Sequence, residues 1–107
     1  MDRKLDAWIA VNVFGYEVVR EKPYKRLYGD GVNIPYFAVK HYTSDMNEAV
    51  KVLEISSMVL PGFYSFYDYC KVEDMDGNTL ALAKISQPAL AICLAAYKLK
   101  TGEDWNE

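Results

Sequence analysis

The first hydrophobic pattern along the chain has the spacing of an α-helix. Leu5, Trp8, Ile9 and Val13 are separated by three or four residues, and acidic residues stand early in the segment. Such spacing places apolar side chains on one helical face, and early carboxylates suit the positive end of the helix dipole. Gly15 follows, and glycine commonly ends a helix. We therefore predict a first helix over residues 2–14.

Two stretches rich in β-branched and aromatic residues come next, at residues 16–20 and 34–42. Both compositions are typical of strands. Between them lies a polar stretch with Pro23 and the turn sequence Gly29-Asp30-Gly31. This arrangement predicts two strands joined by a long, hairpin-like loop.

A second helical pattern opens after Asp45. Met46, Ala49 and Leu53 recur at helical spacing, and hydroxyl side chains precede them. A hydroxyl or carboxylate before an amphipathic run is typical of a helix start. We predict a second helix that ends before Pro61-Gly62.

The last third of the chain predicts a β-hairpin followed by a third helix. Residues 63–72 and 79–85 are strand-like, and a turn sequence, Met75-Asp76-Gly77-Asn78, separates them. Ser86 then offers a capping hydroxyl and Pro88 a first-turn proline before a run of alanine and leucine that ends near Gly102. This helix is apolar on most of its circumference. It therefore needs cover from the sheet and from another helix or a second subunit.

Together these patterns predict an α+β protein with the order α-β-β-α-β-β-α and a largely antiparallel sheet. No linker or repeat interrupts the 107 residues, so we expect one domain over residues 1–107. The apolar fraction of 51% and the charged fraction of 25% are those of an ordinary globular protein.

Composition also argues against several classes of function. The longest apolar run, residues 88–97, is much shorter than the roughly 20 residues that cross a bilayer, and no secretory signal pattern is present. We expect no membrane interaction and a location in the cytoplasm. The net charge of −3 disfavours duplex nucleic acid, whose binding depends on a broad positive field.

The residues that support catalysis or metal binding are few. Cys70 and Cys93 lie in strand and helix interiors, so we expect buried structural thiols, no metal site and no cofactor. His41 is the single histidine, and hydroxyls and Asp45 follow it. The simplest interpretation is that Thr43 or Ser44 caps the second helix and His41 ends a strand. An enzyme acting on nucleotides, with His41 as base and Asp45 as its partner, is the least favoured alternative.

The most informative chemical pattern is a cluster of basic and aromatic residues between Arg20 and Tyr28. Guanidinium and ammonium groups pair with phosphates, and aromatic faces stack on bases, so such a mixture suits a nucleotide. A solvated, charged loop is the alternative. If this loop folds over the start of the second helix, free backbone amides beside two hydroxyls there would add an anion site. The predicted ligand-binding residues are Arg20, Tyr24, Lys25, Arg26, Tyr28, His41, Tyr42, Thr43 and Ser44.

Two further aromatic features leave their roles open. The run over residues 63–69 supplies rings on both faces of its strand, so these rings belong to the core, to an oligomer or to a partner surface. Trp105 has no periodic context, and both docking on a neighbouring subunit and partial exposure fit it.

Three segments resemble the phage ABA sandwich domain family, small uncharacterised proteins of phages and prophages. Tyr42-Thr43-Ser44-Asp45 and the helix after it resemble the opening of that family's middle helix. Residues 88–96 are similar to its closing alanine-rich helix, and residues 5–7 together with residues 13–17 to its opening helix and turn. The resemblance implies a three-layer α/β/α sandwich and a phage origin, and it supplies no catalytic residues.

These observations lead to two hypotheses of function. The first is a non-enzymatic phage accessory protein in the host cytoplasm, which binds and sequesters a small phosphate-bearing molecule such as a nucleotide immune signal. The second is a module that inhibits or recruits a host protein through an exposed aromatic strand. Because a shared pocket would let so small a chain enclose a ligand, we also expect a homo-oligomer.

Overall fold

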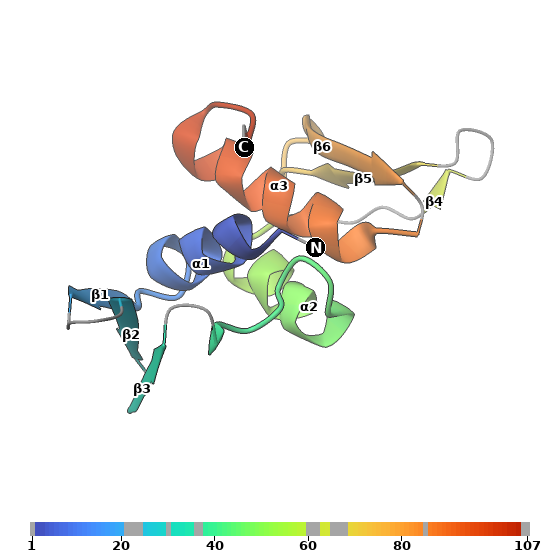
Figure 1. The fold of residues 1–107 in the computed structure, drawn as a ribbon. Helices are drawn as coiled ribbons and strands as arrows, with labels where there is room; N and C mark the ends of the chain where they lie inside the picture. The colour runs from blue at the N-terminus through green and yellow to red at the C-terminus, as the bar shows by residue number, and fades with distance from the viewer. Residues whose placement is uncertain are drawn as a thin grey trace.

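The computed structural model describes residues 2–20, 25–29, 31–35, 38–59, 63–64, 69–84 and 86–105. These residues form three helices and two three-stranded antiparallel sheets (Figure 1). In chain order the elements are α1 (Arg3–Asn12), β1 (Glu17–Arg20), β2 (Lys25–Gly29), β3 (Val32–Pro35), α2 (Met46–Ile55), β4 (Phe63–Tyr64), β5 (Tyr69–Glu73), β6 (Thr79–Lys84) and α3 (Pro88–Thr101). The α+β class is confirmed. The order α-β-β-α-β-β-α and the single sheet are corrected, because each group of strands has three members and forms its own sheet.

The first sheet, β1-β2-β3, shows why the strand boundaries were wrong. β2 lies in the segment that was predicted as a loop, and it pairs with both neighbours. Of the predicted strand over residues 34–42, residues 34 and 35 belong to β3, whereas residues 38–42 are described and lie outside any strand. The guanidinium of Arg3 donates to the carbonyls of Val39 and Lys40. Those carbonyls are therefore satisfied by a side chain rather than by a strand.

A close approach fixes this sheet to the turn after α1. A Cβ atom at Gly29 would lie 2.8 Å from the Tyr16 ring, which is itself buried. Only glycine fits there, so the end of β2 rests directly on an aromatic ring.

The second sheet, β4-β5-β6, confirms the predicted hairpin as β5 and β6. The single strand predicted over residues 63–72 is wrong, because β4 and β5 are separate strands that pair antiparallel. β5 and β6 pair in antiparallel register, with a bulge at Val72/Glu73. The turn between them is held by the Asp74 carboxylate, which accepts hydrogen bonds from the backbone N–H groups of Asp76 and Asn78. Residues 65–68, in the middle of the aromatic run, lie outside the described residues.

Two of the three helix starts differ from expectation in their caps. Asp2 caps α1 by accepting from the N–H of Leu5 at 3.0 Å. Asp45, not Thr43 or Ser44, caps α2 by accepting from Asn47 at 2.9 Å. At α3 the N-cap residue is Gln87, without a side-chain cap, so Ser86 does not take that role.

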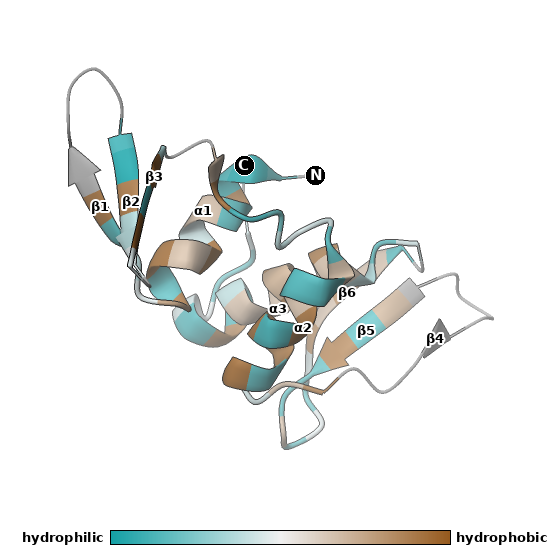
Figure 2. Cartoon of the chain, turned by 90° about the horizontal axis from the view of Figure 1, so that it is seen from below, coloured by the Kyte–Doolittle hydropathy of each residue, from teal (hydrophilic) through white to brown (hydrophobic). Residues whose placement is uncertain are grey.

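The core surrounds α3, as its apolar circumference predicts. α3 packs against β5 and β6 and against α1 and α2, and its residues Ala91, Ile92, Cys93 and Ala95 have no exposed surface. Cover for this helix therefore comes from within one chain. Figure 2 shows α2 with both hydrophilic and hydrophobic segments, as expected for a helix with one buried face.

The molecule is elongated, with extents of 49 × 24 × 24 Å. Figures 1 and 2 both place the two sheets at opposite ends, with the helices between them. This separation determines which of the predicted site residues come together.

Candidate functional site

The segment that leads into α2 is fixed to the start of α1 by a buried carboxylate. Asp6 has no exposed surface, and its Oδ2 lies 2.7 Å from Nη1 of Arg3. Its Oδ1 accepts from the backbone N–H of Thr43 at 2.7 Å. The hydroxyl of Thr43 accepts from the N–H of Asp2 at 3.1 Å and donates to its carbonyl at 3.4 Å. Thr43 therefore has a defined position.

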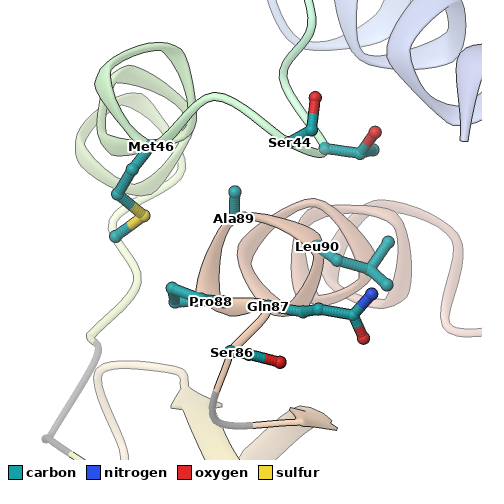
Figure 3. Close-up of a pocket in the computed structure, with 8 residues that line it drawn as sticks. Ser44, Met46, Ser86, Gln87, Pro88, Ala89 and Leu90 are labelled. Carbon is teal, nitrogen blue, oxygen red and sulfur yellow. The ribbon is translucent and has the colours of Figure 1, made fainter. Parts of the chain in front are cut away.

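A pocket of about 300 Å³ opens beside this segment, between the amino ends of α2 and α3 (Figure 3). The residues that line it come from the segment before α2, the first residue of α2, the connection after β6 and the first turn of α3. They are Thr43, Ser44, Met46, Ser86, Gln87, Pro88, Ala89 and Leu90. In Figure 3, Ser44 lies across the pocket from the first turn of α3, and the Gln87 amide extends on the same side as Leu90.

The two helix starts differ in their free donors. At α2 the Asp45 carboxylate already accepts from the Asn47 N–H. At α3 the first intrahelical bond runs from the Ala91 N–H to the Gln87 carbonyl, and Gln87 supplies no side-chain cap. The N–H groups of Ala89 and Leu90 therefore have no acceptor within the helix, and Pro88 has no N–H at all. The N–H groups that could donate to an anion in this pocket are therefore those of α3.

The remaining groups of the pocket are hydroxyl, amide and apolar. Ser44, Ser86 and Gln87 are exposed, whereas Ala89 is buried. None of the described residues that line the pocket is charged. Positive potential would therefore come from the helix dipole and the free N–H groups. The arrangement is able to accept a small anion and to pack an apolar or uncharged portion beside it.

The structure brings together two of the predicted site residues, Thr43 and Ser44. Its pocket adds the start of α3, which sequence reasoning missed. The available signal was Gln87, a residue with little capping preference directly before a first-turn proline.

The predicted residues at positions 41 and 42 lie just before this pocket. His41 is exposed, with Nδ1 3.0 Å from Nη1 of Arg3. Tyr42 is buried and stacks on Phe14, with ring centroids 5.2 Å apart. Asp45, the suggested partner of His41 in an enzyme, instead holds the cap of α2.

The basic residues lie elsewhere, on the first sheet, which Figure 1 places at the other end of the molecule from the amino end of α3. Arg20 ends β1, and Tyr24 lies outside the described residues. Lys25 and Arg26 are neighbours on β2 and so point to opposite faces. The Arg26 guanidinium donates to the side-chain oxygen of Asn33 at 2.7 Å and to its carbonyl at 3.0 Å. The exposed Tyr28 shares the face of Arg26.

Other chemistry is limited in the described part of the chain. Burial raises the pKa of the Cys93 thiol, and the negative charge of Asp6 raises it further. Burial also raises the pKa of Cys70. Both thiols are thus protonated at neutral pH. No three His, Cys, Asp or Glu residues gather there as a metal would require. None of the described helices combines the length and apolar content needed to cross a membrane.

Comparison with known proteins identifies the family. No curated protein and no solved structure matches the chain. The model of the phage ABA sandwich domain matches residues 7–97, a range that contains α2, the larger part of α1 and of α3, both sheets and every residue of the pocket. The chain therefore belongs to the phage ABA sandwich domain family.

Proposed function

We propose that this phage protein is a non-enzymatic accessory protein that binds and sequesters a small phosphate-bearing molecule, such as a nucleotide immune signal of the host. The observation that carries the proposal is the pocket between the amino ends of α2 and α3, where α3 has no side-chain cap. In this proposal the phosphate accepts from the N–H groups of Ala89 and Leu90. Ser44 lines the opposite wall of the pocket.

The size and lining of the pocket support a small ligand. About 300 Å³ lies at the lower end of the range for small-molecule sites, so a mononucleotide fits this volume better than a large cyclic oligonucleotide. Met46, Pro88 and Leu90 offer apolar surface to the rest of the ligand. The proposed binding pocket does not include Lys25, Arg26 or Tyr28. A homo-oligomer and the host cytoplasm stay predictions.

The first experiment is a thermal-shift screen against inorganic phosphate, mononucleotides, cyclic di- and oligonucleotides and cyclic ADP-ribose isomers. A ligand at a hundred times its dissociation constant stabilises the native state by about 2.7 kcal/mol. Sequestration predicts that each bound ligand is recovered intact after heat denaturation. A converted ligand would instead establish an enzyme. No shift across the panel would contradict the proposal and favour a protein-binding module, as in the aromatic-strand hypothesis.

The decisive variant is Gln87→Asp. Aspartate at the N-cap position presents its carboxylate to the same N–H groups that the phosphate would use, and it repels an anion. We expect the free protein to gain about 1 kcal/mol of stability and the ligand-induced shift to disappear. Loss of binding in a stabilised protein is not explained by unfolding.

Met75→Asp is the matched control, because it adds the same charge to the exposed turn between β5 and β6. The ligand-induced shift should survive in this variant. If instead the shift survives in Gln87→Asp, the pocket is not the site.

A further inference from the structure

A second concave surface runs along α1. Its volume is about 500 Å³, and it is open along its length rather than enclosed. One wall is a face of α1, and the others are the exposed Val18 of β1 and the C-terminal Trp105. The lining residues, which we call the tryptophan groove, are Lys4, Ala7, Trp8, Val11, Asn12, Val18 and Trp105.

Both tryptophans of the groove are held in place by a third ring. Tyr97 of α3 contacts Trp8 and Trp105 edge-on, with centroid distances of 4.8 and 4.9 Å. The indole N–H of Trp105 also donates to Oδ2 of Asp2 at 2.7 Å. The aromatic walls are therefore fixed before anything binds, so little conformational entropy is lost on contact.

The charge that lines the groove is positive. Lys4 is the single charged residue among the described lining residues, and it forms no ion pair with another residue that the structure describes. The nearby Asp2 carboxylate is occupied by Trp105 and by the cap of α1. In the described part of the chain, the indole N–H of Trp8 has no hydrogen-bond partner. The complementary group for this lysine is a carboxylate of a partner.

We propose that the tryptophan groove docks an acidic, apolar peptide segment of a partner protein. An aliphatic or aromatic side chain of that segment packs against Trp8, Trp105 and Val18. A neighbouring carboxylate pairs with Lys4, and a backbone carbonyl accepts from the Trp8 indole.

Shape favours a peptide over a nucleotide. Small-molecule sites enclose most of their ligand, whereas this groove is open. Tryptophans in protein interfaces are enriched among the residues that dominate binding. The groove shares no residue with the pocket beside α3, so this inference stands apart from the proposed function.

The test selects binders from a displayed library of random linear peptides against the whole protein and measures the selected peptides by intrinsic fluorescence. Trp8 and Trp105 are the two tryptophans of the sequence, so emission reports directly on the groove. We expect enrichment of aspartate or glutamate beside leucine, isoleucine or phenylalanine, and a change of emission on binding. Lys4→Glu should weaken binding about tenfold or more, because it reverses the charge that faces the peptide.

Lys84→Glu on β6 is the control, since it makes the same charge change at another exposed lysine and should leave the affinity unchanged. Failure to select any peptide would overturn the inference, as would peptides that bind Lys4→Glu as tightly as the original protein. Loss of nucleotide-induced stabilisation in Lys4→Glu would assign the groove to a nucleotide instead. Gln87→Asp should not alter peptide binding, so failure of this inference and failure of the proposed function remain distinguishable.

Discussion

Asp6 is a fully buried acidic residue between apolar neighbours on α1, and its carboxylate joins two segments of the chain. It forms an ion pair with Arg3 and accepts from the Thr43 N–H. Sequence reasoning grouped Asp6 with the early acidic residues of a helix and did not expect its burial. The partners come from a residue three positions earlier and from one 37 positions later, and only the fold brings the second one close.

Replacing Asp6 with Asn should therefore destabilise the protein by about 2 kcal/mol, because Arg3 loses its charged partner and the Thr43 N–H loses a charged acceptor. Urea denaturation measures this loss. Asp76→Asn, at an exposed turn residue, should change stability by less than about 0.5 kcal/mol. Equal effects of the two variants would contradict the role assigned to Asp6.

A second carboxylate gives a prediction about pH. The pKa of Asp74 lies below its usual value, chiefly because the backbone N–H and the side-chain amide of Asn78 donate to it, with further N–H groups of Asp76 and Gly77. The ionised form is thus favoured by folding. Its contribution to stability is present above the carboxyl's ordinary pKa and is lost as pH falls through the lowered value.

An NMR titration should show Asp74 ionising at lower pH in the folded protein than in the protein unfolded by urea. Asn78→Ala removes one donor, so the titration of Asp74 should move upward toward its ordinary pKa. Identical titrations in the folded and unfolded protein would show that the turn does not hold the carboxylate.

At the scale of elements, the helices were more predictable than the strands. α3 has a proline in its first turn and a long alanine-rich run, and Gly102, with a φ of 75°, ends it. These local signals determine the helix. β2 carries no such signal, because Leu27 and Tyr28 stand between two basic residues and a glycine, and its pairing depends on β1 and β3. Strand pairing is a non-local interaction, so a short polar strand resembles a loop until its neighbours are known.

The small residues of α3 allow close packing against a sheet and two helices. Ala95→Leu, at a site with no exposed surface, should cost about 1–3 kcal/mol through overpacking. The melting temperature should fall by several degrees. Lys100→Leu places the same side chain at an exposed site of the same helix and should have little effect. An unchanged melting temperature in Ala95→Leu would mean that α3 is more loosely packed than the structure indicates.

At the scale of the whole molecule, the two ends of the described chain are joined. Trp105 and Asp2, 103 positions apart, share a hydrogen bond of 2.7 Å, and Asp2 also caps α1. The sequence left open whether Trp105 docks on a second subunit. It docks on its own chain.

Trp105→Phe keeps an aromatic ring against Tyr97 but removes the hydrogen bond to Asp2, so we expect a loss of about 1–2 kcal/mol. Hydrogen exchange at the Leu5 amide should become faster, because its acceptor Asp2 is less restrained. Trp8→Phe is the matched control, since the Trp8 indole has no hydrogen-bond partner in the described residues. Equal exchange at Leu5 in both variants would refute the link between the chain ends.

The sequence alone determined the α+β class, the three helices, the β5–β6 hairpin and the family, because these depend on local spacing, caps and turn residues. Only the tertiary structure decided which residues meet. It placed Thr43 and Ser44 beside the uncapped start of α3, and it placed Lys25 and Arg26 on a separate sheet. Contacts between segments distant in the chain depend on how the helices pack. Local patterns along the sequence do not reveal that packing.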